Sequence, residues 1–482
     1  MPDNNPREED SAEALGARES EVRSSGNRHT SIGENGDSRF EEGDTSTERR
    51  EESVADVSPA PQHKPGLEVV EEEVVRATGI ALPATFAAFE HRNYRLYWFG
   101  NLASLIGTWM QNIATGWLVL TLTNSPFFVG LNSTLAWLPA WFVSLPAGAM
   151  ADRFDKRRMM ILTQSVLALF ALVLAVLYWT HVLTIYYVLA ISCLTGFAAT
   201  MNGPIAQTLV PDLVGRKNVL NAIALNNAMF NSARIIGPAI AGVLLGTIGA
   251  GGCFGINSAS FLAIIGALWF IQLPPREPHR AEESVWHQIL AGLRFVAGHP
   301  DIRILVVLTA VFSSFGMIYL PLMPVFARDV FHQGAREYGV MMTCVGIGAV
   351  AGGLTLATIS KTRRKGVILT LGTAGIGLSS IALSLVRDIR LALPLIAIIG
   401  FCQTSITSLM NTLIQTIAPE HIRGRALSVY MLAFNGMFPL GCLLGGAIAQ
   451  RFGAPAATLV GGCAVLVSLG AVSVLAPSLR RL

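Results

Sequence analysis

Charge is scarce in this 482-residue chain, and titratable groups are missing from its apolar stretches. Asp, Glu, Lys and Arg make up 14% of the residues, against about a quarter in soluble domains. We place none of the 32 acidic residues and none of the nine histidines in the middle of an apolar stretch. An acid–base enzyme inside a membrane would need such groups there, so we predict that the chain is not an enzyme. A proton relay would need them too.

Cysteine is also rare, and no phosphate-binding loop is present. The six cysteines all lie within apolar stretches and form no CxxC pair, so they are expected to behave as small apolar side chains. The chain has no metal-spaced His/Cys cluster and no GxxxxGK[ST] pattern, which argues against metal binding and against ATP hydrolysis of that kind. We therefore expect no metal, no cofactor and no nucleic-acid partner.

What the chain does contain is a succession of apolar stretches from position 97 to the end, and 52% of all residues are hydrophobic. A helix of about 20 apolar residues crosses the hydrocarbon core of a bilayer. We predict an all-α polytopic membrane protein, with twelve transmembrane helices in two pseudo-symmetric six-helix bundles. The predicted spans are 97–122, 126–150, 158–179, 184–207, 219–247, 252–273, 302–326, 337–359, 366–386, 391–415, 426–449 and 455–477.

The distribution of Lys and Arg over the loops predicts the orientation. Eighteen lie on one side of the predicted membrane, in loops such as 151–157 and 360–365, and five lie on the other. Cytoplasmic loops carry the excess of basic residues. We therefore expect a multi-pass protein of the cell inner membrane with both termini in the cytoplasm.

The chain divides into four regions. Residues 1–92 carry 21 acidic and 10 basic side chains and are expected to form a disordered cytoplasmic tail with a short amphipathic lead-in at Phe86–Arg95; docking of a partner by this tail is the alternative. Residues 93–273 are the first bundle and 302–482 the second bundle with a short tail. Between them, 274–301 is a cytoplasmic linker with apolar residues at helical spacing, which predicts an amphipathic helix.

An internal repeat relates the two bundles. The motif QTLVPD at 207–212 recurs as QTIAPE at 415–420, and each copy follows the fourth span of its bundle. Duplicated bundles are a recurrent plan of transporters, in which the substrate site lies between the repeats near the middle of the membrane.

The motif GAMADRFDKRR at 148–158 forms the cytoplasmic turn after the second span. The acid Asp152 is placed to face the positive N-terminal end of a neighbouring helix, and the basic residues can pair with carboxylates. We predict that this turn is a conformational latch; a basic turn that only sets orientation is the alternative. The latch residues are Gly148, Asp152, Arg153, Arg157 and Arg158. The motif resembles the signature of the major facilitator superfamily, with Asp155 where that signature commonly has glycine.

The fifth span carries Arg234, the one charge that we place well inside a membrane span. An embedded arginine faces a cavity or a partner. Its role is either functional, holding an anionic substrate group or gating the cavity, or structural, bonding backbone carbonyls of an adjacent helix. The residues Gly237, Pro238 and Gly242 that follow resemble the antiporter motif of exporters in the same superfamily.

Polar side chains at helical spacing predict where a substrate cavity lies. They are expected to face the interface between the bundles, although hydrogen bonding between helices would give the same pattern. The predicted cavity residues are Asn101, Thr108 and Gln111 of the first span, Asn227, Asn231 and Arg234 of the fifth, and Thr404, Ser408 and Asn411 of the tenth.

Further motifs resemble one branch of the superfamily, the enterobactin-exporter-like transmembrane secretion effectors. These motifs are RNYRLYW, GTWMQ, TNSP, LVPDLV, GLRFV and RGRA, and the likeness covers about residues 85–478. The resemblance implies a secondary transporter that exports a siderophore, a macrolide or another drug-like molecule and is driven by protons. We expect the protein to be a monomer. Two alternatives stay open: a transporter-shaped binding or scaffold protein, and an uptake porter of the same fold.

Overall fold

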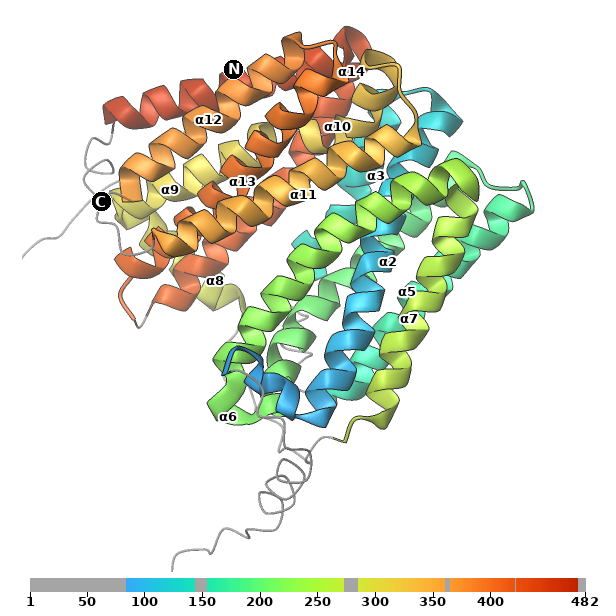
Figure 1. Ribbon diagram of the computed structural model, residues 1–482. Helices are drawn as coiled ribbons and strands as arrows, with labels where there is room; N and C mark the ends of the chain where they lie inside the picture. Colours follow the sequence, from blue (N-terminus) through green and yellow to red (C-terminus); the bar gives the residue numbers. More distant parts are fainter. Residues whose placement is uncertain (1–83, 144–153, 273–284, 360–364, 421, 476–482) are drawn as a thin grey trace, which may run out of the picture. The chain divides into compact units, whose positions relative to one another are not determined.

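The computed structural model describes residues 84–143, 154–272, 285–359, 365–420 and 422–475, which all belong to one compact unit, Val70–Leu482. Every regular element in these ranges is a helix, as the apolar pattern predicts (Figure 1). Most of the predicted acidic tail lies outside the described residues. We refer to residues 84–272 as the first half and to residues 285–475 as the second half.

The helices of the two halves have the following bounds. The first half contains the 3₁₀-helix η1 (Ala84–Glu90) and the α-helices α2 (Arg92–Thr123), α3 (Pro126–Trp137), α5 (Lys156–Trp179), α6 (Ile185–Thr247) and α7 (Gly249–Phe270). The second half contains α8 (Val285–Gly298), α9 (Pro300–Val311), α10 (Tyr319–Val325), α11 (Ala335–Thr358), α12 (Lys365–Leu385), α13 (Ile389–Ile417) and α14 (Arg423–Leu475). Two π-helical turns, η2 (Phe312–Gly316) and η3 (Phe326–Val330), follow α9 and α10.

Two helices each cover two predicted spans, because the loops expected between those spans are helical. The 63-residue α6 includes the spans predicted at 184–207 and 219–247. The 53-residue α14 includes the span at 426–449 and most of the span at 455–477. Each run is interrupted at one glycine with positive φ, Gly215 at 66° and Gly453 at 86°. Glycine adopts this conformation readily because it has no Cβ.

Eight helices in the described part of the chain are long and apolar enough to cross a membrane. The helix α2, which covers the first predicted span, is not one of them, although it has 32 residues. Its polar residues, among them the buried Ser104, Gln111 and Thr115, lower its hydropathy. The helix α3 has 12 described residues, and residues 144–153 lie outside the described part.

The ends of the helices follow local sequence signals. Asp155 caps α5 by accepting a hydrogen bond from the Arg158 backbone N–H at 2.8 Å. Asn124 ends α2 in the left-handed conformation, and Pro126 begins α3 at a position where the missing N–H costs nothing. Asp388 caps α13 through the Arg390 N–H at 2.8 Å.

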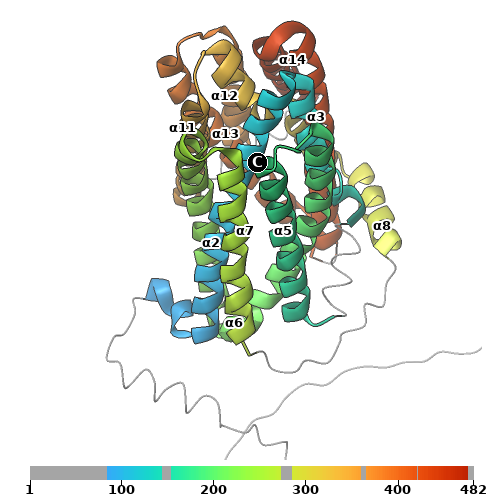
Figure 2. The same ribbon diagram turned by 90° about the vertical axis from the view of Figure 1, so that its right-hand side faces the viewer.

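Within each half the helices lie along one another. In the first half, α2 packs against α6 and α7, and α5 packs against α7 (Figure 2). In the second half, α13 packs against α11 and α12, and α14 packs against α12. The lead-in predicted at Phe86–Arg95 consists of η1 and the start of α2, and Ala88 donates its backbone N–H to Asn221 Oδ1 of α6 at 2.9 Å.

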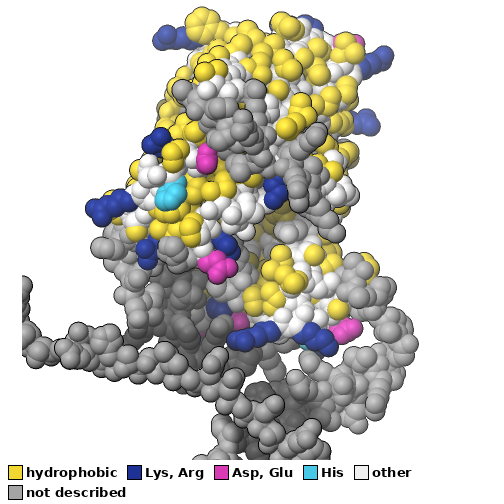
Figure 3. All heavy atoms as spheres, turned by 90° about the vertical axis from the view of Figure 1, so that its left-hand side faces the viewer, with side chains coloured by type: hydrophobic (Ala, Val, Ile, Leu, Met, Phe, Trp, Pro, Cys, Tyr) yellow, Lys and Arg dark blue, Asp and Glu magenta, His cyan; other side chains and the backbone are white. Residues whose placement is uncertain are grey.

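The outer surface of the unit is apolar. Large apolar side chains are exposed along many helices, for example Leu172 of α5, Leu262 of α7 and Leu371 of α12. Figure 3 shows one face on which apolar atoms predominate and charged side chains are scattered. Such a surface is suited to lipid rather than to water.

Candidate functional site

The two halves meet along two pairs of helices, α6 with α11 and α3 with α14. Both contacts are made through glycines. Gly242 of α6 lies against Gly339 of α11, and Gly130 of α3 lies against Gly446 of α14. A Cβ at any of these positions would overlap backbone atoms of the opposite helix. Small residues permit this close approach between membrane helices.

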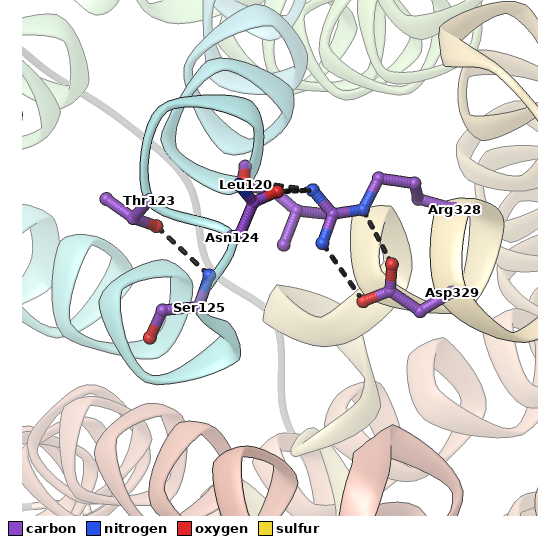
Figure 4. Close-up of polar contacts among 6 residues, drawn as sticks. All are labelled: Leu120, Thr123, Asn124, Ser125, Arg328 and Asp329. Carbon is purple, nitrogen blue, oxygen red and sulfur yellow. Dashed lines mark hydrogen bonds and ion pairs between the residues drawn. The ribbon is translucent and has the colours of Figure 1, made fainter.

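Most side-chain hydrogen bonds between the halves lie at one end of the unit, which we call the closed end; Thr134 of α3, which donates to the Pro439 carbonyl of α14 at 2.9 Å, lies farther along α3. Arg328, in η3, donates to the Leu120 carbonyl at 3.1 Å and to Asn124 Oδ1 at 2.8 Å. Asp329 holds the other edge of the same guanidinium, at 2.6 Å from Nε and 3.2 Å from Nη2 (Figure 4). Ser125 donates to Gln450 Oε1 of α14 at 2.6 Å.

The Arg328 contact uses the polarity of a helix end. The Leu120 carbonyl, in the last turn of α2, also accepts the backbone N–H of Asn124 at 2.9 Å, and the partial negative charge of this helix end attracts a cation. Arg328 occupies this position, and its Asp329 partner neutralises the guanidinium. No local pattern indicates this contact, because Arg328 lies 208 positions from Leu120 and 204 from Asn124 in the sequence.

Aromatic contacts add to the interface between the halves. Trp117 of α2 stacks on Tyr338 of α11 with ring centroids 6.1 Å apart. Trp137 of α3 meets Phe438 of α14 edge to face at 5.5 Å. These aromatic pairs contribute apolar contacts between the halves, in addition to the polar contacts at the closed end.

A cavity of about 380 Å³ lies between α3, α6 and α14. It is found at the C-terminal end of the described part of α3 and near the N-terminal end of α14, on the opposite side from the closed end. Its lining combines apolar and polar side chains from both halves. They are Ala140, Trp141, Gln207, Leu427, Ser428, Val429, Met431, Leu432, Asn435 and Gly436.

Of the predicted latch, the structure describes Arg157 and Arg158. Arg157 donates to the Leu268 carbonyl through Nε and to the Trp269 carbonyl through Nη2, both at 2.6 Å. These carbonyls belong to the last turn of α7, where a cation is favourable. Arg158 is exposed. The other three latch residues, Gly148, Asp152 and Arg153, lie outside the described residues.

The structure contains an ion pair beside Arg157 that was not predicted from the sequence. Lys156, at the start of α5, lies 2.7 Å from Asp212 of α6 and also donates to the Thr208 carbonyl at 2.9 Å. Both side chains are partly shielded from solvent. The signal was present, because Asp212 belongs to the repeated QTLVPD motif and Lys156 to the basic turn.

The predicted polar face of α2 is divided between two environments. Gln111 is buried and accepts a hydrogen bond at 2.6 Å from Asn257 Nδ2 of α7, inside the first half. Thr108 donates to its own helix at the Ser104 carbonyl, and Asn101 donates to Tyr97 Oη at 3.4 Å. The side chains of Asn101 and Thr108 are half-buried.

The predicted residues of α6 lie along the side of the helix that approaches the second half. Asn231 donates to the Asn227 carbonyl at 2.8 Å. Arg234 is half-buried, and its carbonyl lies against Gly346 of α11. The antiporter-like residue Gly237 lies against Ile106 and Trp109 of α2. The other two, Pro238 and Gly242, both lie against Gly339 of α11.

The predicted residues of α13 are half-buried. Thr404 lies beside Gly353 of α11. Asn411 accepts a hydrogen bond from Gln415, one turn later. No hydrogen bond of Ser408 to the side chain of another described residue is present. On the same helix, the buried Gln403, which was not predicted, accepts a hydrogen bond from Tyr319 of α10 at 2.5 Å.

The sequence profile of the transmembrane secretion effector family matches residues 83–480. A multidrug efflux pump, Tap, of Mycolicibacterium fortuitum is 29% identical over 80% of this chain and 95% of its own length. The staphyloferrin A transporter of Staphylococcus aureus is 26% identical over 72% of this chain and 87% of its own length. The enterobactin exporter EntS of Shigella boydii serotype 4 is 26% identical over 78% of this chain and 86% of its own length.

Solved transporter structures share the fold. The nucleoside transporter NupG superposes with a TM-score of 0.65 at 14% identity, over 80% of this chain and 99% of that one. The POT family transporter PepTSo superposes with a TM-score of 0.62 at 13% identity, over 81% and 98%.

Proposed function

The chain belongs to the transmembrane secretion effector family of membrane transporters, and from this premise we propose that it exports a small organic molecule across the bacterial inner membrane. Siderophores, macrolides and other drug-like compounds are the substrate classes, since relatives are named as a multidrug efflux pump and as an enterobactin exporter. The observation that carries the proposal is the family match over residues 83–480. The contact of the two halves at one end, with a cavity between them towards the other, is the geometry that such transport needs.

In this proposal the membrane domain has twelve spans in two six-helix bundles, 93–273 and 302–482, joined by the linker 274–301. The breaks at Gly215 and Gly453 divide α6 and α14 each into two spans. The excess of Lys and Arg on one set of loops places both termini in the cytoplasm. The protein acts as a monomer, and residues 1–92 form the cytoplasmic tail.

The bundles alternate between two arrangements. The closed end corresponds to the outer side of the membrane, so the cavity beside Trp141 and Asn435 opens towards the cytoplasm and receives substrate there. Export then requires the contacts of Arg328 with α2 to break while contacts at the cytoplasmic end form. A substrate favours this change only if it binds the two arrangements with different affinity.

The latch and the antiporter-like residues take part in the switch. Arg157 holds the cytoplasmic end of α7 against α5, and Asp152, which lies outside the described residues, is the acid of the proposed latch. Gly237, Pro238 and Gly242 let α6 approach α2 and α11 closely enough to seal the path. The path of the substrate runs from the cavity past the predicted polar residues of the first, fifth and tenth spans, none of which lines the cavity itself. Gln111 is the exception, because it is bonded to Asn257 within the first half. Protons are the coupling ion, as the family resemblance implies.

The test is transport by the full-length protein reconstituted into liposomes. A pH gradient is imposed, and the flux of candidate siderophores, macrolides and dyes is followed in both directions. We expect gradient-dependent flux towards the side that corresponds to the cell exterior. Liposomes that contain the Gly130→Leu variant, which cannot close the α3–α14 contact, are the control. Absence of gradient-dependent flux for a broad panel would reject the proposal, and flux only in the opposite direction would indicate uptake.

A further inference from the structure

Three polar side chains from three helices converge in the interior of the membrane domain. Arg234 comes from α6, Tyr319 begins α10, and Gln403 lies in α13. Tyr319 is fully buried and donates its hydroxyl proton to Gln403 Oε1 at 2.5 Å. The Arg234 carbonyl lies against Gly346 of α11, and the carbonyl of the adjacent Val345 lies against Gly400 of α13, which precedes Gln403 by one turn. Arg234 and Tyr319 are also close enough to influence each other's charge.

This cluster lies far from both ends of the helices. Gln403 is the middle residue of the 29-residue α13. At about 1.5 Å of rise per residue, it is roughly 20 Å from either end of that helix. Arg234 precedes the last residue of α6 by 13 positions, and its carbonyl lies against Gly346 of α11, which also packs against α13. The cluster therefore lies where the two halves of the chain meet.

Arg234 has no carboxylate to neutralise it among the described residues. It forms no hydrogen bond and no ion pair with a residue in the described part of the chain. Every acidic residue that the structure describes lies at a helix end or next to the break at Gly215. These residues are Glu90, Asp155, Asp212, Asp301, Asp329, Glu337, Asp388 and Glu420. Arg234 is half-buried, and a partly desolvated charge without a partner is costly, so an anionic ligand would lower the free energy of this arrangement.

The cluster offers hydrogen-bond donors. The Tyr319 proton is used on Gln403 Oε1, which orients the amide so that its Nε2 remains a donor. No hydrogen bond from Gln403 Nε2 to a described residue is present. The Arg234 guanidinium supplies several N–H groups in a planar fork that matches the two oxygens of a carboxylate. A cationic ligand would meet a like charge and no acceptor of comparable strength.

We propose that Arg234 and Gln403 bind an oxyanion of the exported molecule, a carboxylate in the simplest case, and that Tyr319 positions Gln403 for this contact. The inference rests on the proposed export function and narrows its substrates to molecules that carry an ionised acid group. Neutral amides of the same molecules bind weakly, and lipophilic cations are excluded.

The experiment compares acids with their amides on the full-length protein. The probes are 1-naphthoate and salicylate, each with its primary carboxamide, and tetraphenylphosphonium as the cation. Dissociation constants come from thermal-shift titrations in detergent micelles, and efflux of the same probes is measured in liposomes. The variants are Arg234→Gln and Gln403→Leu. Arg451→Gln is the matched control, because Arg451 is an exposed arginine in the same membrane domain. Size-exclusion profiles establish that each variant is folded.

We expect the wild type to bind at least one acid about tenfold to a hundredfold more tightly than its amide, the range for a hydrogen bond to a charged group. Arg234→Gln removes this preference, Gln403→Leu reduces it, and Arg451→Gln keeps it. The inference is overturned if Arg234→Gln keeps the preference, if no acid binds better than its amide, or if the cation binds as tightly as the acids. Acid-selective binding without efflux would reject export and leave the anion site in place. Acid efflux that Arg234→Gln leaves unchanged would reject the anion site and leave the export function in place.

Discussion

Replacing Arg328 should open the closed end. Its guanidinium joins η3 of the second half to the end of α2 through two hydrogen bonds, at 3.1 Å to the Leu120 carbonyl and at 2.8 Å to Asn124 Oδ1. A hydrogen bond from a charged donor contributes about 1.5–3 kcal/mol when it is buried. Arg328 is 26% exposed, so solvent screening reduces this, and we expect about 1–3 kcal/mol in total. That amount shifts a two-state equilibrium by about 5- to 150-fold.

The assay measures the distance between spin labels at the closed end. The labels are attached at Leu122 and His332, which are exposed and belong to different halves, in a background whose six cysteines are replaced by alanine. Arg328→Gln should increase the fraction of protein with a long distance, and Arg328→Lys should increase it less. Arg336→Gln is the control, because Arg336 is exposed in the first turn of α11 and has no polar contact with a described residue. An unchanged distance distribution in Arg328→Gln, or an equal change in Arg336→Gln, would refute the reasoning.

Three other predictions concern contacts within and between the halves. Gly130→Leu should prevent α3 from reaching α14, so that a Leu122 label stays accessible and transport is lost; normal transport would contradict the close contact. Neutralising either Lys156 or Asp212 should lower the free energy of unfolding by about 1 kcal/mol, and exchanging the two charges should restore most of this loss in thermal unfolding. No recovery in the exchanged variant would show that the ion pair does not supply this stability. Asn257→Leu should leave the buried Gln111 amide unpaired and lower the free energy of unfolding by about 1–3 kcal/mol, measured by thermal unfolding in micelles, whereas the exposed control Asn112→Leu should have little effect.

The membrane character and the family could be read from the sequence, because both depend on local features. A run of apolar residues stabilises a helix in lipid wherever it stands in the chain, and a motif such as GAMADRFDKRR is recognised from consecutive residues. The caps at Asp155 and Asp388 are local as well. The helical continuation through the loops expected at 208–218 and 450–454 was missed, because local patterns do not distinguish a loop from helices that meet at one glycine.

The tertiary structure decided which polar residues meet. The spacing of the polar residues of α2 predicts that they share one face of the helix. Gln111 is nevertheless bonded inside the first half to Asn257, which lies 146 positions away in the sequence. Gln403 directly precedes the predicted cavity residue Thr404, and only the tertiary structure brings Tyr319 to it. Arg328 reaches α2 across 208 positions. An apolar helix is stable in lipid through its own hydrogen bonds and composition, but the partner of a polar side chain depends on how distant helices pack. That packing is a sum of many weak contacts between surfaces that no single stretch of sequence contains.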